Sequence, residues 1–293
     1  MHRVLEHIDR NLDQELELRT LAQVAHFSAF HFHRVFFAWT GETLGAYLRR
    51  RRLEIAASRL AGQPKLSILN VAVSVGFGST EAFARAFRAR FGCTATQWRA
   101  SVALQSNPGQ RLSNPSQTQE ELGHNNGNTK SNPLGIAMKV KVIDRKPVKV
   151  TYLRHVGAYG KPLSEFWQKT VYPWLAVNNQ LGQPRYGISL DDPKITAAAK
   201  CRYDAGVEVH GKIVVPGESQ TTTIPGGQYA VTPFCGTVEQ VGDVWEAMLR
   251  DWLPKSGMQL DARPFFEYYP TDASFDPKTG VFTCDIAIPV AAI

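Results

Sequence analysis

The sequence predicts two domains, an all-α N-terminal half and an α+β C-terminal half built from two strand–helix–strand–strand repeats. Three observations predict this arrangement. The chain has 293 residues, which is enough for two hydrophobic cores. Residues 106–137 contain six asparagines, three prolines and no aromatic residue. The stretches on either side each contain an internal repeat. We therefore expect domains at residues 1–105 and 138–293.

Residues 106–137 are expected to form a flexible linker. A stretch of this composition cannot bury enough apolar surface to offset the entropy that it would lose on ordering. It separates a half rich in alanine and arginine from a half rich in valine, tyrosine, proline and glycine.

The N-terminal half contains an ungapped repeat. The stretch "SAFHFHRVFFAWTG" begins at Ser28, and "STEAFARAFRARFG" begins 51 residues later at Ser79. The two copies share the pairs Ser28/Ser79, Phe32/Phe83, Arg34/Arg85, Phe36/Phe87 and Gly41/Gly92. A repeat without insertions indicates that one structural unit occurs twice.

The helices of this half follow from apolar spacing and from capping residues. In chain order, they are expected within residues 4–12, 18–27, 28–41, 43–61, 67–79 and 79–92. Ser28 and Ser79 can each cap a helix, which Gly41 or Gly92 then ends. A short helix, a tight turn and a capped second helix, occurring twice, are typical of two helix-turn-helix units.

Helical periodicity separates the core face of each capped helix from its outward face. The phenylalanines lie four residues apart within each copy, on one stripe that we expect to pack inward. The residues expected to point elsewhere are Phe30, His33 and Arg34 in the first copy and Thr80, Glu81 and Arg85 in the second. Exposed arginines can pair with guanine in the major groove or hold a phosphate. We expect no metal site at His31 and His33, because positions i and i+2 diverge on a helix.

Positive charge is concentrated in the same half. Residues 34–99 hold 11 lysines and arginines against 3 acidic residues, whereas residues 138–293 hold 17 against 16. The run "RRRR" at 49–52 distributes its charges around the long helix. We expect part of it, including Arg49, to contact phosphates and part to be solvated surface. A local charge of this size indicates a phosphate-backbone binder, with an ordinary basic surface as the alternative.

Residues 1–105 resemble the DNA-binding domain of AraC/XylS transcription regulators. The resemblance rests on "SAFHFHRVF", "GETLGAYLRRRRL", "VGFGSTEAFARAFRARFG" and the pair Trp98-Arg99. It implies two helix-turn-helix units joined by a long helix, with the outward residues named above reading successive major grooves of double-stranded promoter DNA. It also implies RNA polymerase as a partner. One departure is Ala95, where the family usually has proline, and it should not affect the DNA face.

The C-terminal half is repeated more faintly. The first copy has Pro147, Gly157, Trp167 and Trp174, and the second has Pro225, Gly236, Trp245 and Trp252. Each copy begins with an extended segment, "VKVTYLRHV" or "GQYAVTPFC", followed by a helix with two tryptophans and then by further strands. The tryptophans lie seven residues apart, which predicts one helix face and, in the main, a role in core packing.

Residues 138–293 resemble the GyrI-like small-molecule-binding domain. The stretches that carry the resemblance are "YLRHVGAYG", "GISLDDP", "CRYDAGVEV", "IPGGQYAV", "VWEAMLRDWLPKSG", "RPFFEYYP" and "IAIPV". The resemblance implies binding of a lipophilic, often cationic organic compound in an aromatic groove between the repeats. It also implies a central glutamate that neutralises the ligand, which matches Glu267.

The residues around Glu267 agree with that role. A carboxylate in the aromatic strand "RPFFEYYP" either faces solvent or faces inward, where it needs a cation. Aromatic faces beside an inward carboxylate attract organic cations. The aromatic companions expected in the groove are Tyr152, Tyr159, Tyr186, Trp245 and Tyr268.

Two other functions remain open for the C-terminal half. The first is hydrolysis of electrophilic drugs, with Glu267 as a base whose pKa is raised by burial. The second is binding of another protein. No serine, histidine and aspartate constellation is legible, Cys235 has no evident base beside it, and no cofactor is implied. A ligand-responsive transcription regulator is therefore the expected function.

The remaining composition predicts a cytoplasmic protein with no membrane partner. No apolar run approaches the roughly 20 residues of a membrane span. The opening residues carry acidic side chains and lack the apolar core of a signal peptide. The four cysteines are scattered without CxxC spacing and are expected to be reduced thiols.

Overall fold

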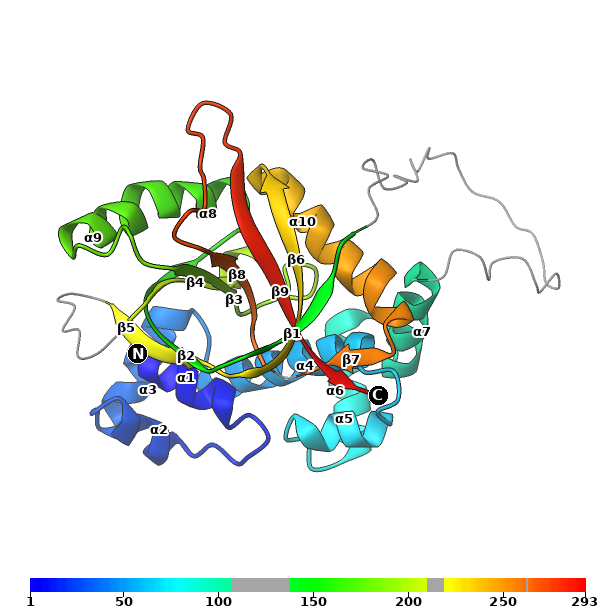
Figure 1. The fold of residues 1–293 in the computed structure, drawn as a ribbon. Helices are drawn as coiled ribbons and strands as arrows, with labels where there is room; N and C mark the ends of the chain where they lie inside the picture. The colour runs from blue at the N-terminus through cyan, green and yellow to red at the C-terminus, as the bar shows by residue number, and fades with distance from the viewer. Residues whose placement is uncertain (107–137, 210–218, 262) are drawn as a thin grey trace, which may run out of the picture.

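The computed structural model describes residues 1–106, 138–209, 219–261 and 263–293 (Figure 1). It confirms an all-helical N-terminal region and an α+β C-terminal domain. Of the expected linker, only Ser106 lies within the described residues, where it ends a helix. The limits of the linker and of the two domains therefore stay predictions.

Seven helices are described in the N-terminal region. They are α1 (His2–Arg10), α2 (Leu18–Val24), α3 (Ala29–Thr40), α4 (Leu44–Gly62), α5 (Ile68–Ser74), α6 (Thr80–Phe91) and α7 (Ala95–Ser106). The hydroxyl groups of Ser28 and Ser79 accept hydrogen bonds from the backbone N–H groups at the starts of α3 and α6. Both helices end at a glycine in the left-handed region, with φ of +70° at Gly41 and +74° at Gly92.

Helix α4 joins two separate hydrophobic cores. Phe32 and Phe36 of α3 are buried in a core with α1 and α2, to which α4 contributes Tyr47. Phe83 and Phe87 of α6 are buried in a second core, to which α4 contributes Leu53 and its neighbours. The phenylalanine stripes therefore pack inward as expected, and each helix-turn-helix unit has its own core.

The C-terminal domain is built on one antiparallel sheet. Its strands are β1 (Lys141–Arg145), β2 (Val148–Val156), β3 (Arg185–Ser189), β4 (Arg202–Glu208), β5 (Gln220–Ile224), β6 (Gly227–Gly236), β8 (Phe265–Tyr269) and β9 (Phe282–Ala292). Their order in the sheet is β1-β6-β9-β8-β3-β4-β2-β5, and the short β7 (Met258–Leu260) pairs with the end of β9. The order is symmetric. Strands β3 and β8 lie side by side at the centre, β4 and β9 lie outside them, and β2 and β6 follow, so that the two repeats form equivalent halves of the sheet.

One helical segment per repeat covers the same face of the sheet. The first consists of α8 (Lys161–Phe166), a π-helical turn (Trp167–Val171) and α9 (Tyr172–Val177). The second consists of α10 (Val238–Ala247), a π-helical turn (Met248–Trp252) and a 3₁₀ turn (Leu253–Lys255). The wide π turn changes the helical phase. Trp167 and Trp174 both pack against one hydrophobic core, and Trp245 and Trp252 against another, but of the four Trp167 and Trp245 alone line a cavity.

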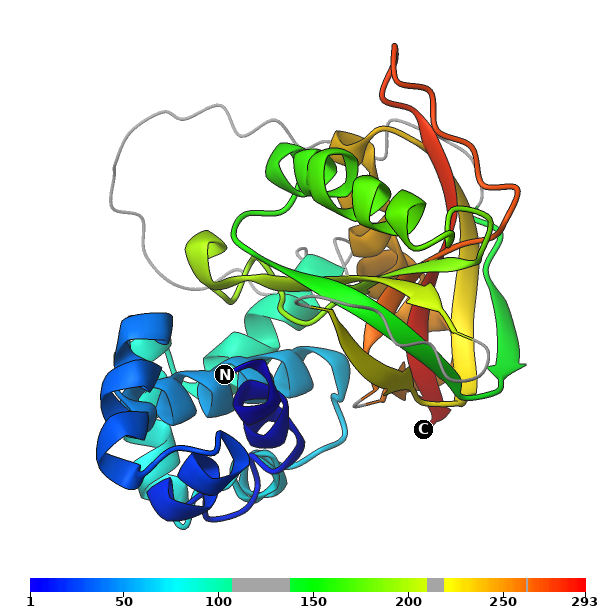
Figure 2. The same ribbon diagram turned by 90° about the vertical axis from the view of Figure 1, so that its left-hand side faces the viewer.

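The two domains are in direct contact (Figure 2). The C-terminal end of α4 lies against β7, where the Gln63 side chain donates a hydrogen bond of 2.8 Å to the Leu260 carbonyl oxygen. The loop between β3 and β4 brings Ile195 into the second helical core, where only 8% of its surface is exposed. A residue of the C-terminal domain thus completes the core of the N-terminal one.

Candidate functional site

The outward faces of α3 and α6 carry the basic residues expected there. His33, Arg34, Glu81 and Arg85 are exposed, and Thr80 is half-buried. The side chain of Phe30 is outside the described part of the chain. Because both helices are capped and anchored by their phenylalanines, their outward faces are presented as two rigid surfaces that can enter a groove.

The exposed faces continue one turn beyond the residues expected from the repeat. Phe37 is 52% exposed and Arg88 is exposed, and these two residues occupy equivalent positions in the two copies. Each lies three residues after Arg34 or Arg85, so it shares the same helix face. The i+3 spacing is the sequence signal that indicates them.

The four arginines at 49–52 of α4 lie in different surroundings. Arg49 is exposed and can still contact phosphate. Arg50 pairs with Glu42 and Glu54, at 3.0 Å in each case. Arg52 donates to the Leu12 and Gln14 carbonyl oxygens, and Arg51 is buried at the domain contact. Neighbouring side chains and backbone groups therefore hold Arg50, Arg51 and Arg52, and of the four arginines Arg49 is the exposed one.

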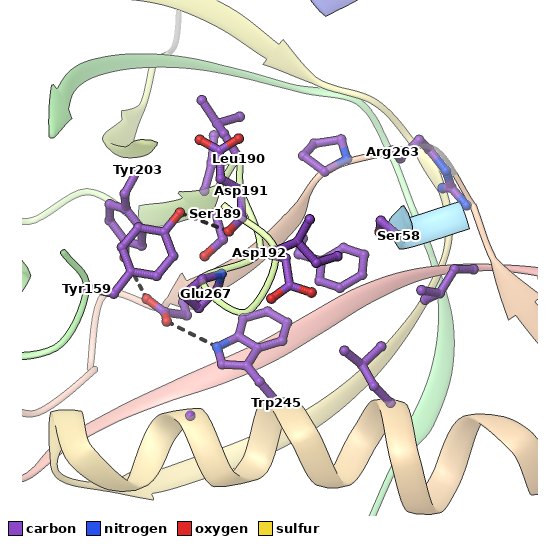
Figure 3. A pocket seen from close by; sticks show the side chains of 18 of the residues that line it. Ser58, Tyr159, Ser189, Leu190, Asp191, Asp192, Tyr203, Trp245, Arg263 and Glu267 are labelled. Carbon is purple, nitrogen blue, oxygen red and sulfur yellow. Dashed lines mark hydrogen bonds between the residues drawn. The ribbon is translucent and has the colours of Figure 1, made fainter. Parts of the chain in front are cut away.

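A cavity of about 1970 Å³ extends from the sheet of the C-terminal domain to the N-terminal region. Pockets for drug-sized molecules are typically about 300–1,000 Å³. Glu267 and Trp245 line one part of the cavity, and Ser58 of α4 lines another (Figure 3). A compound held at Glu267 alone would leave much of this volume free.

Glu267 is the central polar group of the cavity and only 6% of its surface is exposed. Its carboxylate accepts hydrogen bonds from the Tyr203 hydroxyl at 2.6 Å, the Tyr269 hydroxyl at 2.8 Å and the Trp245 indole N–H at 3.4 Å. No lysine or arginine among the described residues lies within ion-pair distance of it. Burial raises the pKa of Glu267, although these three hydrogen bonds favour the charged form.

The backbone of β3 leaves the space for this arrangement. Gly187 lies directly opposite Glu267 in the sheet. A Cβ atom at Gly187 would lie 1.6 Å from the Tyr203 hydroxyl and 2.7 Å from Glu267 Oε2. The absence of a side chain at this position therefore permits the Tyr203–Glu267 hydrogen bond.

Two of the five predicted aromatic companions line the cavity with Glu267. Trp245 donates to the carboxylate, and its ring stacks on Phe265 at 5.9 Å. Tyr159 packs edge-on against Tyr203 at 6.0 Å. Further rings that line the cavity are Trp167, Tyr172, Tyr203, Phe265 and Tyr269.

The structure places the other three predicted rings on the opposite face of the sheet. Tyr268 pairs with Tyr186 across β8 and β3, one residue out of step with Glu267 and Gly187. Successive strand residues point to opposite faces, so Tyr186 and Tyr268 pack with Phe266 in a different cluster. Tyr152 shares that face, and its hydroxyl donates to Glu6 of α1. These three tyrosines do not line the cavity.

The loop between β3 and β4 connects the cavity wall to the helical region. Asp191 in this loop accepts hydrogen bonds from Arg202 at 2.9 and 3.0 Å and pairs with Arg51 of α4. Asp9 of α1 pairs with the same two arginines, at 2.6 Å from Arg202 and 3.2 Å from Arg51. Burial acts to raise the pKa of Asp191, but the charges of Arg51 and Arg202 outweigh it and hold that pKa at about 2.

The aromatic side of the cavity also reaches this ionic cluster. The Tyr159 hydroxyl lies 2.6 Å from the carbonyl oxygen of Arg202 and 3.1 Å from that of Asp191 (Figure 3). Contacts therefore run without a break from Glu267 through Tyr203 and Tyr159 to the residues that bind α4.

The described residues contain no group of three or more His, Cys, Asp or Glu side chains that could hold a metal ion. Within the same part of the chain, no helix is long and apolar enough to cross a membrane.

Two capped helices with basic outward faces, joined to an aromatic cavity around a buried carboxylate, define the class of protein. It is a DNA-binding regulator that carries a small-molecule-binding domain. Residues 138–291 match the family described as the GyrI-like small molecule binding domain, and residues 21–101 match a helix-turn-helix domain family.

Similar proteins match one half or the other. The SPbeta prophage-derived protein YosT of Bacillus subtilis (strain 168) is 28% identical over 154 residues, covering 52% of this chain and 99% of YosT. The regulatory protein SoxS of Salmonella typhimurium is 34% identical over 96 residues, covering 33% of this chain and 89% of SoxS. The transcriptional regulator Rob of Salmonella typhimurium is 38% identical over 96 residues, covering 32% of each chain.

The chain belongs to the family of the GyrI-like small molecule binding domain, joined here to an AraC-type helix-turn-helix DNA-binding domain. It is a transcription regulator of the AraC family with an effector-binding domain.

Proposed function

We propose that the chain regulates transcription in response to a lipophilic organic cation that binds at Glu267. The observation that carries this proposal is a buried carboxylate with neutral hydrogen-bond donors and no cationic partner among the described residues. A buried charge without a counter-ion is costly, and a cation entering the cavity removes that cost. The rings of Trp245, Tyr203 and Tyr269 provide faces that attract organic cations.

The contact between the domains supports a regulatory use of this binding. The cavity is lined by residues of both domains, including Ser58 of α4. The same loop that contributes Asp191 to the cavity wall also supplies Ile195 to the core under α6. An effector that shifts this loop acts on the helix that joins the two DNA-binding units. RNA polymerase is the proposed partner that receives the signal at a promoter.

Hydrolysis of an electrophilic compound is the second candidate for the cavity. It is favoured by one observation, the raised pKa of the buried Glu267, which would suit a general base. The two candidates differ in the fate of the compound, because a sensor releases it unchanged. Recovery of the bound compound, followed by mass spectrometry, distinguishes them.

Ligand binding by the full chain tests the proposal. Calorimetric titration with tetraphenylphosphonium and with the neutral triphenylphosphine oxide would be run on the wild type, Glu267→Gln and Glu246→Gln. Glu246 lines the same cavity but is partly exposed and paired with Lys194, so it is the matched control. We expect the wild type and the control to prefer the cation, and Glu267→Gln to lose that preference. Equal affinity of the wild type for both compounds would contradict cation sensing.

The regulatory part needs a separate measurement. A DNA site would be selected from a random pool with the full chain, and its dissociation constant measured with and without tetraphenylphosphonium. A change in affinity, or in transcription by RNA polymerase from a promoter carrying that site, is expected. Cation binding without either effect would restrict the C-terminal domain to binding alone.

A further inference from the structure

Arg185 is a charged residue of the cavity for which the structure supplies no counter-ion. It begins β3 and lies opposite Tyr269 of β8, two residues before Gly187. It therefore points to the same face of the sheet as Glu267, about 6.6 Å further along the strand. Arg185 lines the cavity, and only 9% of its surface is exposed.

The guanidinium group of Arg185 lacks the partners that buried arginines normally have. Its Nε atom is buried and has no hydrogen-bond partner. In the described ranges, no carboxylate forms an ion pair with it, whereas the buried Arg51, Arg154 and Arg202 each pair with at least one aspartate. The ring of Tyr172 lies 5.6 Å from Arg185 Cζ. That contact favours the cation but leaves the buried Nε–H group unsatisfied.

The cavity thus contains two unpaired charges of opposite sign on one sheet face. Tyr269 neighbours both, because it follows Glu267 by two residues on β8 and is paired with Arg185 of β3. Its hydroxyl is directed to Glu267, and its ring packs against Trp167 at 5.5 Å. Arg185 and Glu267 are diagonal neighbours in this strand pair, and no ion pair joins them in the described part of the chain.

We propose that Arg185 binds an anionic group of the effector, so that the preferred effector is a lipophilic zwitterion. Its cationic group lies at Glu267 and its carboxylate at Arg185. A planar guanidinium binds a carboxylate through two parallel N–H···O bonds, which suits an arginine fixed in a buried position. The proposal rests on the proposed function, because it assumes that Glu267 binds the cationic part of the same molecule.

Two dyes that differ only at the carboxyl group test this assignment. Rhodamine 6G is an ethyl ester with an aromatic cation, and its parent free acid is the corresponding zwitterion. Fluorescence polarisation would give the dissociation constants of both dyes with the full chain. The variants would be Arg185→Gln, Arg185→Lys and the control Arg250→Gln. Arg250 also lines the cavity but pairs with Asp251, at 2.9 Å, and is partly exposed.

We expect the wild type and Arg250→Gln to bind the free acid about tenfold or more tightly than the ester, as a charge-assisted bidentate pair implies. Arg185→Gln should lose this preference while binding the ester as the wild type does. Arg185→Lys keeps the positive charge but lacks the parallel N–H donors of a guanidinium, and it should retain part of the preference for the free acid. Thermal unfolding of each variant confirms that the folded chain is being compared.

Each contrary outcome has a distinct meaning. Equal affinity of the wild type for both dyes, or a preference that persists in both Arg185 variants, would overturn the anion subsite and leave cation binding standing. A wild type that binds tetraphenylphosphonium but neither dye would also overturn it. A wild type that binds no cation of any kind would overturn both this inference and the proposed function.

Discussion

Gly187 shows how one missing side chain shapes the binding site. Its position opposite Glu267 would be filled by any Cβ atom, which would displace the Tyr203 hydroxyl from the carboxylate. The two central strands are related by the repeat, so Gly187 is the counterpart of Glu267. A second carboxylate there would bring two like charges together in a buried place. The asymmetry of the two repeats therefore leaves a single acidic group at the centre of the sheet.

Gly187→Ala is expected to lower the free energy of unfolding by about 1–3 kcal/mol, because the new methyl group overpacks a filled space. It should also abolish cation binding, because Tyr203 and Glu267 must move apart. Urea unfolding and calorimetric titration measure the two effects. Gly182→Ala is the control, since a Cβ atom there meets nothing within 4 Å. Wild-type cation affinity in Gly187→Ala would show that the Tyr203 contact is dispensable.

Cation affinity is expected to depend on pH through Glu267. Burial raises the pKa of this carboxyl above its ordinary 4.5, so it contributes stability at low pH and loses that contribution as the pH rises through the raised pKa. A cation binds the ionised form. Affinity should therefore rise with pH up to the raised pKa, by as much as tenfold per unit, and then level off. Titrations from pH 5 to pH 8 would measure this, and Glu267→Gln should give a flat profile.

At the scale of single elements, α3 and α6 are two copies of one capped helix. A serine cap, two buried phenylalanines and a left-handed glycine determine where each helix begins, which face packs and where it ends. The outward positions are free to differ, and they do, with Phe37 in one copy where Arg88 stands in the other. The two helices can therefore read different base pairs from equivalent positions.

Arg85→Ala is expected to weaken binding to the selected DNA site by about 1–3 kcal/mol and to relax specificity at the base pairs that it contacts. The reason is the loss of a bidentate donor to a base or of a phosphate contact. Electrophoretic mobility shifts at two salt concentrations would separate these cases, because the loss of a phosphate contact also reduces the salt dependence of binding. Arg250→Ala removes the same charge from the C-terminal domain and should bind normally. Unchanged affinity in Arg85→Ala would exclude α6 from the interface.

At the scale of the whole molecule, the buried ionic cluster joins the domains. Arg51 of α4 and Arg202 of β4 share the carboxylates of Asp9 and Asp191. Such a cluster is costly to desolvate, and its value lies in requiring one geometry, because removing a member leaves the remaining buried charges with fewer partners. We therefore expect the relative position of the domains to respond to changes at Asp191, which is part of the cavity wall.

Asp191→Asn is expected to cost about 3–5 kcal/mol of stability and to uncouple the domains, because Arg51 and Arg202 lose a shared counter-ion. Urea unfolding gives the first effect, and the change of DNA affinity on adding tetraphenylphosphonium gives the second. The neighbouring Asp192 is exposed, so Asp192→Asn should stay within about 0.5 kcal/mol of the wild type. A fully coupled Asp191→Asn variant would rule out this route between the sites.

Some residues of the candidate site could be predicted from the sequence, and others could not. Strand alternation in "RPFFEYYP" indicates that Tyr269, two residues after Glu267, shares its face, whereas the adjacent Tyr268 cannot. Arg185 and Tyr203 line the same cavity from distant segments, and nothing in the sequence around them predicts that position. The run at 49–52 is similar, because only the packing of α1 and the β3–β4 loop on α4 distinguishes Arg49 from the buried Arg51.

The sequence by itself determined the helix-turn-helix units and the repeated α+β domain, and its resemblance to the GyrI-like domain indicated Glu267 as the candidate ligand-binding carboxylate. The first two depend on local physics, namely apolar period and capping residues. Only the tertiary structure decided which rings surround Glu267, that Arg185 lacks a counter-ion and that Arg51 belongs to the domain contact. These depend on which face of a strand meets which helix, and that is set by the pairing of segments far apart in the chain.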